Sequence, residues 1–170
     1  MMRRIGWAVA GLVLAACVHG CMMPTEKPAK GDKLLDFPVY TLDGQQTSLV
    51  KATQGKVAVI KFGASWCTWC TRQIPALNQI AARYPKDTVV VVDIDLQESP
   101  KVVQAYAQKN GVAYTMLLDP RGTGAQLYEF KAIPVTIIAG PDGTIAYRGT
   151  YSTFNEMDRV VASLVAKPKQ

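Results

Sequence analysis

The chain has 170 residues, of which 49% are hydrophobic and 19% charged, and this composition excludes an extensively disordered protein. Its length suits one domain with a full hydrophobic core and some additional chain at the ends. The net charge of +6 at pH 7 is mild and the basic residues are spread along the sequence, so we expect no nucleic-acid partner. We expect the protein to be a monomer.

The N-terminus has the features of an export signal. Residues 1–4 carry two arginines, and residues 5–16 form an uninterrupted run of apolar and small side chains. This run is shorter than the ~20 residues that a membrane-spanning helix needs. We therefore predict a secretory signal peptide over residues 1–16.

The end of that run resembles the lipobox of bacterial lipoproteins. Residues 14–16 read Leu-Ala-Ala before Cys17, and the resemblance implies cleavage before Cys17 and attachment of lipid to this cysteine. An uncleaved anchor with a chance cysteine is the alternative, and Cys21 is a poorer lipid site. Residues 17–32 have no apolar period, so we expect a lipidated spacer that holds the domain away from the membrane.

The elements of the remaining chain follow from its apolar periodicity. In chain order we predict strands at residues 37–42 and 45–50 joined by the turn Asp43-Gly44, a strand at 57–62, a helix at 68–84, a strand at 88–94, a helix at 100–110, a strand at 114–118, a short helix at 122–130, strands at 135–139 and 144–148, and a final helix at 154–166. Strands that alternate with helices predict an α/β domain over residues 33–167, with a central mixed sheet flanked by helices.

Two cysteines lie where a predicted strand is followed by a helix. The unpaired N–H groups and the dipole of a helix N-terminus favour an anion, so a thiolate at Cys67 would be stabilised. Cys70 lies in the first helical turn on the same side, close enough to form a disulfide with Cys67. These positions predict thiol–disulfide exchange, in which Cys67 attacks a substrate disulfide and Cys70 resolves the mixed disulfide.

Other uses of a Cys-x-x-Cys element fit this sequence less well. A structural zinc site needs about four protein ligands, but Cys17, His19 and Cys21 all precede the predicted domain. A c-type haem site would need histidine after Cys70, where Thr71 stands, and no histidine follows for a copper site. We therefore expect no metal and no cofactor, and a purely structural disulfide is the alternative.

Two stretches of sequence resemble the active site of thioredoxins. Residues 63–70 read Gly-Ala-Ser-Trp-Cys-Thr-Trp-Cys, with Trp66 directly before the first cysteine, and residues 133–136 read Ile-Pro-Val-Thr. The second stretch resembles the cis-proline loop of that family. The resemblance implies that Pro134 faces the two cysteines and that a cis bond aims the backbone of Ile133 at an incoming chain.

Further features resemble the membrane-anchored TlpA/ResA group of thioredoxin-like proteins. They are the N-terminal hairpin, Pro75 inside the first long helix, and an inserted strand and helix at residues 91–108. The resemblance implies a thioredoxin-like fold with that β-hairpin and αβ insertion. It also implies reduction of disulfides in exported proteins, often apocytochrome c, at the periplasmic or extracytoplasmic face of a bacterial membrane, with electrons from a membrane-embedded thiol carrier.

Three positions depart from the pattern of these families. Trp69 stands where the group usually has proline, Gln73 where it often has glutamate, and Lys61 where thioredoxins have a buried aspartate. A charged Lys61 would stabilise a thiolate at Cys70, and a neutral one would accept the proton of that thiol. In a third interpretation the side chain of Lys61 reaches the surface. The direction of electron flow is therefore open.

Asp93, Asp95 and Glu98 lie at or just after the end of the strand at residues 88–94. Such a group of acids could serve in acid–base catalysis or bind a metal, but we expect all three to be solvated. Three alternatives to a reductase are a disulfide oxidase or isomerase, a peroxiredoxin-like antioxidant and a non-enzymatic metal-binding carrier. A peroxidase would need a different sequence around its cysteine, and a metal carrier would need a downstream histidine.

Overall fold

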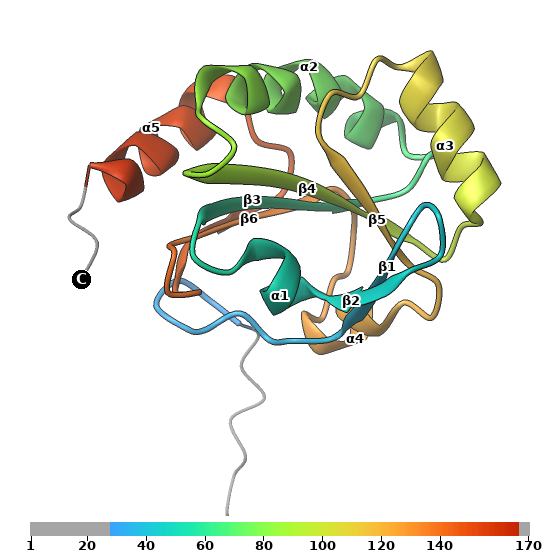
Figure 1. Ribbon diagram of the computed structural model, residues 1–170, viewed down its shortest axis with the longest axis horizontal. Helices are drawn as coiled ribbons and strands as arrows, with labels where there is room; N and C mark the ends of the chain where they lie inside the picture. Colours follow the sequence, from blue (N-terminus) through green and yellow to red (C-terminus); the bar gives the residue numbers. More distant parts are fainter. Residues whose placement is uncertain (1–27, 167–170) are drawn as a thin grey trace, which may run out of the picture.

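Seven strands form one mixed sheet in the computed structural model, which describes residues 28–166 (Figure 1). The strands are β1 (Pro38–Thr41), β2 (Gln46–Ser48), β3 (Val57–Gly63), β4 (Val89–Leu96), β5 (Thr115–Asp119), β6 (Val135–Ala139) and β7 (Ile145–Gly149). The predicted signal peptide and the predicted lipid site at Cys17 lie outside the described residues.

The strand order across the sheet is β2-β1-β5-β4-β3-β6-β7. β3, β4 and β5 run parallel, whereas β1, β6 and β7 pair antiparallel with their neighbours. β3 is an inner strand and is buried over its whole length, as its β-branched residues predict. The predicted α/β domain with a mixed sheet, an N-terminal hairpin and an αβ insertion is therefore confirmed.

Helices cover both faces of this sheet (Figure 1). They are α1 (Leu49–Thr53), α2 (Thr68–Arg83), α3 (Pro100–Lys109), α4 (Thr123–Leu127) and α5 (Phe154–Val165). α2, α3 and α5 lie on one face, and α1 and α4 lie on the other. No helix within residues 28–166 is both long enough and apolar enough to span a bilayer.

Each face of the sheet has its own core. Against α2 and α5, the apolar stripe of α2 packs on the odd-numbered residues of β3, with Leu77 and Ile80 fully buried. On the opposite face four aromatic rings gather, and the centroids of Phe62 and Phe130 are 4.5 Å apart. Because side chains of a strand alternate between faces, Lys61 points to the α2 face and Phe62 to the aromatic face.

The structure differs from the predicted hairpin at its end. The second predicted strand was residues 45–50, but β2 ends at Ser48 and α1 begins at Leu49. The side chain of Ser48 caps α1 by accepting a hydrogen bond from the amide of Lys51 at 3.3 Å. The prediction was wrong here because a capping serine and a fully buried Leu49 fit a short helix as well as a strand.

The segment before β1 lies along the start of β7, which is an outer strand of the sheet. The amide of Gly31 donates to the carbonyl of Ile145, and the amide of Ile145 donates to the carbonyl of Asp32, both at 2.8 Å. Lys33 and Thr144 form an isolated bridge next to them. The N-terminal segment therefore continues the sheet by one short stretch of pairing.

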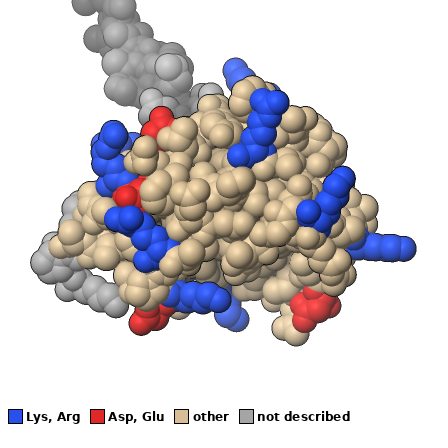
Figure 2. All heavy atoms as spheres, turned by 90° about the horizontal axis from the view of Figure 1, so that it is seen from above, with Lys and Arg blue, Asp and Glu red and all other residues tan. Residues whose placement is uncertain are grey.

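Basic side chains stand apart from one another on the face shown in Figure 2, and they do not merge into a continuous patch. This face is the upper one of Figure 1, which α2, α3 and α5 form. The distribution agrees with the scattered basic residues of the sequence and gives no concentrated positive surface on this side.

Candidate active site

Cys67 and Cys70 are joined as a disulfide at the N-terminus of α2. Cys67 is the N-cap residue, and its sulfur accepts a hydrogen bond from the amide of Cys70 at 3.2 Å. Cys67 is 7% exposed whereas Cys70 is fully buried, so an incoming thiol or disulfide meets Cys67 first. The predicted position between a buried strand and a helix is confirmed.

The loop before β6 lies against this pair. The peptide bond between Ile133 and Pro134 is cis, as the sequence predicts. The carbonyl oxygen of Ile133 lies 3.7 Å from Cys67 Sγ, a distance at which a reduced Cys67 can donate a hydrogen bond to it. The two stretches that resemble the thioredoxin active site thus meet in the structure although about sixty residues separate them.

Two tryptophan rings flank the disulfide and are open to solvent. Trp66 is 73% exposed and Trp69 is 54% exposed. The ring of Trp69 packs edge-on against Tyr151 with 5.5 Å between centroids, and the guanidinium of Arg72 lies 4.8 Å from its centroid. Trp69 therefore joins an exposed aromatic rim that a polypeptide can contact next to the cysteines.

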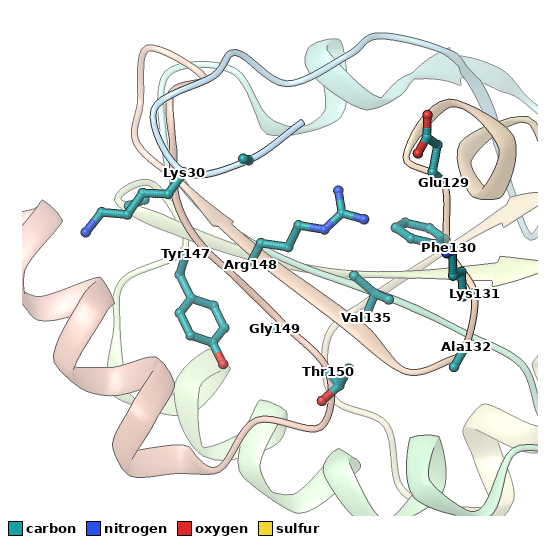
Figure 3. A pocket seen from close by; sticks show the side chains of 12 residues that line it. Lys30, Glu129, Phe130, Lys131, Ala132, Val135, Tyr147, Arg148, Gly149 and Thr150 are labelled. Atoms are coloured by element: carbon teal, nitrogen blue, oxygen red, sulfur yellow. The ribbon is translucent and has the colours of Figure 1, made fainter. Parts of the chain in front are cut away.

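A shallow hollow lies beside the cis-proline loop, between β7 and the segment at residues 129–135 (Figure 3). Arg148 crosses it toward the ring of Phe130, with 5.5 Å between the guanidinium carbon and the ring centroid. Lys131 and Ala132 line the hollow directly before Ile133. The hollow therefore borders the loop that faces Cys67.

Lys61 is buried beneath the cysteines and forms an ion pair with Asp93. The side chain is 1% exposed, and its ammonium lies 2.5 Å from Asp93 Oδ2. The interpretation in which Lys61 reaches the surface is wrong, because β3 and β4 pair Lys61 directly with Asp93 and supply its counter-charge. Burial raises the pKa of Asp93, and the positive charge of Lys61 counters that rise.

Gly63 makes room for this ammonium next to Cys70. A Cβ atom on Gly63 would lie 2.9 Å from Lys61 Cε and 3.1 Å from both Lys61 Nζ and Cys70 Sγ. The absence of a side chain at Gly63 therefore leaves space that Lys61 fills. Lys61 Nζ and Cys70 Sγ lie 3.1 Å from the same Cβ position, so the distance between these two atoms is at most twice 3.1 Å.

Asp95 and Glu98 form a second polar group on the same side of the sheet. Asp95 is 2% exposed, and its carboxyl lies within hydrogen-bond reach of Glu98. The amide and hydroxyl of Ser65 each donate to the Glu98 carboxylate at 2.6 Å. The expectation that Asp93 and Asp95 are solvated is wrong, because β4 continues through Leu96 and buries both aspartates in the sheet, whereas Glu98 is partly exposed.

The pKa values of Asp95 and Glu98 are shifted in opposite directions. Burial raises the pKa of Asp95 to about 9, and the hydrogen bond and charge of Glu98 raise it too. Burial also acts to raise the pKa of Glu98, but the hydrogen bonds from Ser65 outweigh it and lower that pKa. At neutral pH Asp95 therefore holds a proton and Glu98 is ionised.

Gln73 supplies no acid at the position where the TlpA/ResA group often has one. It is fully buried, and its amide nitrogen donates to Thr136 Oγ1 at 2.8 Å. The carboxyl groups near Cys70 come instead from β4, which sequence reasoning missed. Within the described part of the chain, no set of three histidine, cysteine or acidic side chains is arranged to hold a metal ion.

Comparison with known proteins gives the family of the chain. Residues 30–148 match the model of the AhpC/TSA family. The thioredoxin-like protein YneN of Bacillus subtilis is 31% identical over 119 residues, which are 68% of this chain and 68% of YneN. The thiol-disulfide oxidoreductase ResA of Bacillus cereus is 23% identical over 137 residues, 81% of this chain and 79% of ResA.

A solved structure of similar fold is the crystal structure from Chlorobium tepidum described as a thiol:disulfide interchange protein DsbE. It superimposes with a TM-score of 0.72 at 24% identity, covering 81% of this chain and 98% of that one. The family match extends over the strand-to-helix turn with the cysteine pair and over the cis-proline loop. The chain belongs to the AhpC/TSA family of thioredoxin-like proteins and is a thiol–disulfide oxidoreductase.

Proposed function

We propose that the protein is a disulfide reductase of exported proteins, held at the extracytoplasmic face of a bacterial membrane by lipid on Cys17. The export signal and the lipobox-like residues before Cys17 support the location. The residues between Cys17 and the segment that pairs with β7 would give the domain reach from the bilayer. Apocytochrome c is a candidate substrate and a membrane-embedded thiol carrier a candidate electron donor.

The balance of charge around the cysteines carries the choice of reductase over oxidase. A disulfide couple becomes more oxidising when its reduced form is stabilised, as a nearby cation does for a thiolate. Here Asp93 lies 2.5 Å from the ammonium of Lys61 and offsets its charge. Glu98 adds a carboxylate that is bound to Ser65, two residues before Cys67. These carboxylates offset the groups that stabilise a thiolate and so favour a reducing potential.

The surroundings of Cys67 support a polypeptide as the substrate. Exposed Trp66 and Trp69 offer apolar area on one side of the disulfide, and the hollow of Figure 3 borders the Ile133–Pro134 loop on another. An extended chain that passes Cys67 has a carbonyl of the loop and two rings within reach. Such contacts suit varied sequences better than one small molecule.

The reduction potential of the Cys67–Cys70 couple tests the proposed direction. The full chain is equilibrated in dithiothreitol buffers of set ratio, and the free thiols are counted after alkylation. We expect a value near that of thioredoxin, about −270 mV, whereas a value near that of DsbA, about −120 mV, would make the protein an oxidase. The Asp93→Asn variant, which leaves the charge of Lys61 unmatched, is expected to shift the potential in the oxidising direction.

The lipid anchor has a matched pair of variants in the chain itself. A Cys17→Ser variant is expected to lose incorporation of labelled palmitate and to leave the membrane fraction, because one cysteine carries the anchor. The Cys21→Ser variant is the control, and it should keep both label and membrane association. Loss of label in Cys21→Ser but not in Cys17→Ser would move the lipid to Cys21.

A further inference from the structure

Two carboxyl groups beneath Cys70 take no part in the attack and resolution steps of disulfide exchange. Asp95 is 2% exposed, and its Oδ1 accepts no hydrogen bond from any group within residues 28–166. The polar group within its reach is the carboxyl of Glu98, and two ionised carboxylates have no hydrogen to share. The contact between them therefore requires one proton on the pair.

Asp95 lies on β4, next to the part of β3 that approaches the sulfur of Cys70. Gly63 and Asp95 are direct partners in the parallel pairing of β3 and β4, so their side-chain positions face the same helix. The Cβ position of Gly63 is 3.1 Å from Cys70 Sγ. Gly63 adds no side chain there, and the ammonium of Lys61, 3.1 Å from the same Cβ position, shares this space with the sulfur.

Glu98 connects Asp95 to the surface. It is partly exposed, and it accepts two hydrogen bonds from Ser65 in the turn that leads to Cys67. A proton on Asp95 thus has an outlet to water through Glu98.

Titratable groups surround Asp95 from each neighbouring element. They are Lys61 of β3, Asp93 of β4, Glu98 of the following loop and Tyr106 of α3. Burial raises the pKa of Asp95 to about 9, with Glu98 and Asp93 adding to the rise and Lys61 opposing it. A free thiol titrates near 8.5, so a proton passes between such a carboxyl and a thiol with little difference in free energy.

We propose that Asp95 gives a proton to Cys70 when the disulfide opens and takes it back when the disulfide closes, while Glu98 exchanges the proton of Asp95 with solvent. This proton transfer belongs to the exchange reaction itself and takes place whatever the direction of electron flow and the substrate. The acid for this transfer comes from β4. The position at which thioredoxins have a buried aspartate holds Lys61 on β3, and the position at which the TlpA/ResA group often has glutamate holds Gln73 on α2.

The reductant in this step is a dithiol. Its thiolate attacks Cys67 Sγ and forms a new S–S bond, the Cys67–Cys70 bond breaks, and the electron pair passes to Cys70 Sγ. That sulfur takes the proton of Asp95, and Asp95 regains one from water through Glu98. The second thiolate of the reductant then displaces Cys67 as a thiolate and completes the two-electron reduction.

The rate of opening as a function of pH tests this role. Dithiothreitol reduces the full-length oxidised protein, tryptophan fluorescence follows the reaction, and each rate is divided by the thiolate concentration. We expect the wild-type value to be level at neutral pH and to fall as Asp95 loses its proton near pH 9. In Asp95→Asn it should be lower by about tenfold or more at pH 7 and should show no fall near pH 9.

The control for this measurement is Asp119→Asn. Asp119 is another buried acid at the end of a strand, but it accepts hydrogen bonds from the amides of Thr123 and Gly124, away from the cysteines. This variant should keep the wild-type rate and its fall near pH 9. If Asp95→Asn retains the rate and pH profile of the wild type, the proposed proton transfer is wrong.

Urea unfolding of the same proteins provides a second readout. The folded state holds a proton on Asp95 up to about pH 9, whereas the unfolded chain releases it near 3.8, so the folded state binds one more proton between these values. The wild type therefore loses stability as pH rises through this window. The equilibrium constant for folding of the wild type, divided by that of Asp95→Asn, should fall by up to about tenfold per pH unit. Parallel curves for the two proteins would show that Asp95 is ionised and would overturn the proposal.

Discussion

A Cys70→Ser variant is expected to accumulate a mixed disulfide with its substrate, whereas a Cys67→Ser variant forms none. Cys67 is the sulfur that solvent reaches and that the amide of Cys70 stabilises as a thiolate. Cys70 is fully buried behind it, so it attacks only the sulfur of Cys67. Turnover should fall by about a thousandfold or more in both variants, since each removes one step of the exchange.

Reduction of a peptide with one internal disulfide measures this loss, and a non-reducing gel detects the mixed disulfide. Both variants are made together with Cys21→Ser, so that a thiol outside the pair does not form the adduct. The Cys21→Ser protein by itself should turn over normally. A stable adduct in Cys67→Ser, or none in Cys70→Ser, would reverse the assigned order of attack.

Substitution of Lys61 alone is expected to cost about 3–5 kcal/mol of unfolding free energy, because Lys61→Met leaves Asp93 buried without its partner. Replacement of both residues, as Lys61→Met with Asp93→Leu, should restore most of this loss, since two apolar side chains pack at no cost in desolvated charge. Urea denaturation of the wild type, the two single variants and the double variant forms a complete cycle.

The loss in Lys61→Met should also depend on pH. Burial raises the pKa of Asp93, and the missing ammonium removes the charge that opposed this rise. The folded variant then binds a proton that the unfolded chain has released, so its stability falls further behind the wild type as pH rises from acid to neutral. A cost below about 1 kcal/mol at pH 7 would be that of an exposed pair and would contradict the buried geometry.

The same variant separates a chemical role of Lys61 from a structural one. A role in the exchange requires that Lys61→Met change the thiolate titration of the reduced Cys67–Cys70 pair, because the ammonium lies beside the buried sulfur. An unchanged titration together with a large loss of stability would limit Lys61 to holding the sheet together.

The sequence predicted the order of elements well because most of them carry strong periodic patterns. β3 and β6 are runs of buried apolar residues, and α2 has its apolar side chains at helical spacing. α1 was missed because five residues are too few to establish a helical period. The boundary between β2 and α1 depends on the hydrogen bond of one serine side chain.

The cysteines and the cis-proline loop were also predictable, since each lies within a short stretch that resembles a known family. The burial of the β4 acids Asp93 and Asp95 was not predictable. A polar side chain by itself indicates exposure, and these two are buried because β4 packs beside another strand. A signal for them was nevertheless present in the alternation Val91, Asp93, Asp95, which puts all three on one face. A buried Lys61 on the neighbouring strand needs a negative partner on that face.

The pairing of the N-terminal segment with β7 also protects the protein from self-association. An outer strand with free N–H and C=O groups can pair with the same strand of another molecule and so begin aggregation. The hydrogen bonds between Gly31, Asp32 and Ile145 occupy those groups at the start of β7. Shortened forms of the protein should therefore keep the chain from residue 28 onward, because a form that begins after Lys33 would uncover this edge.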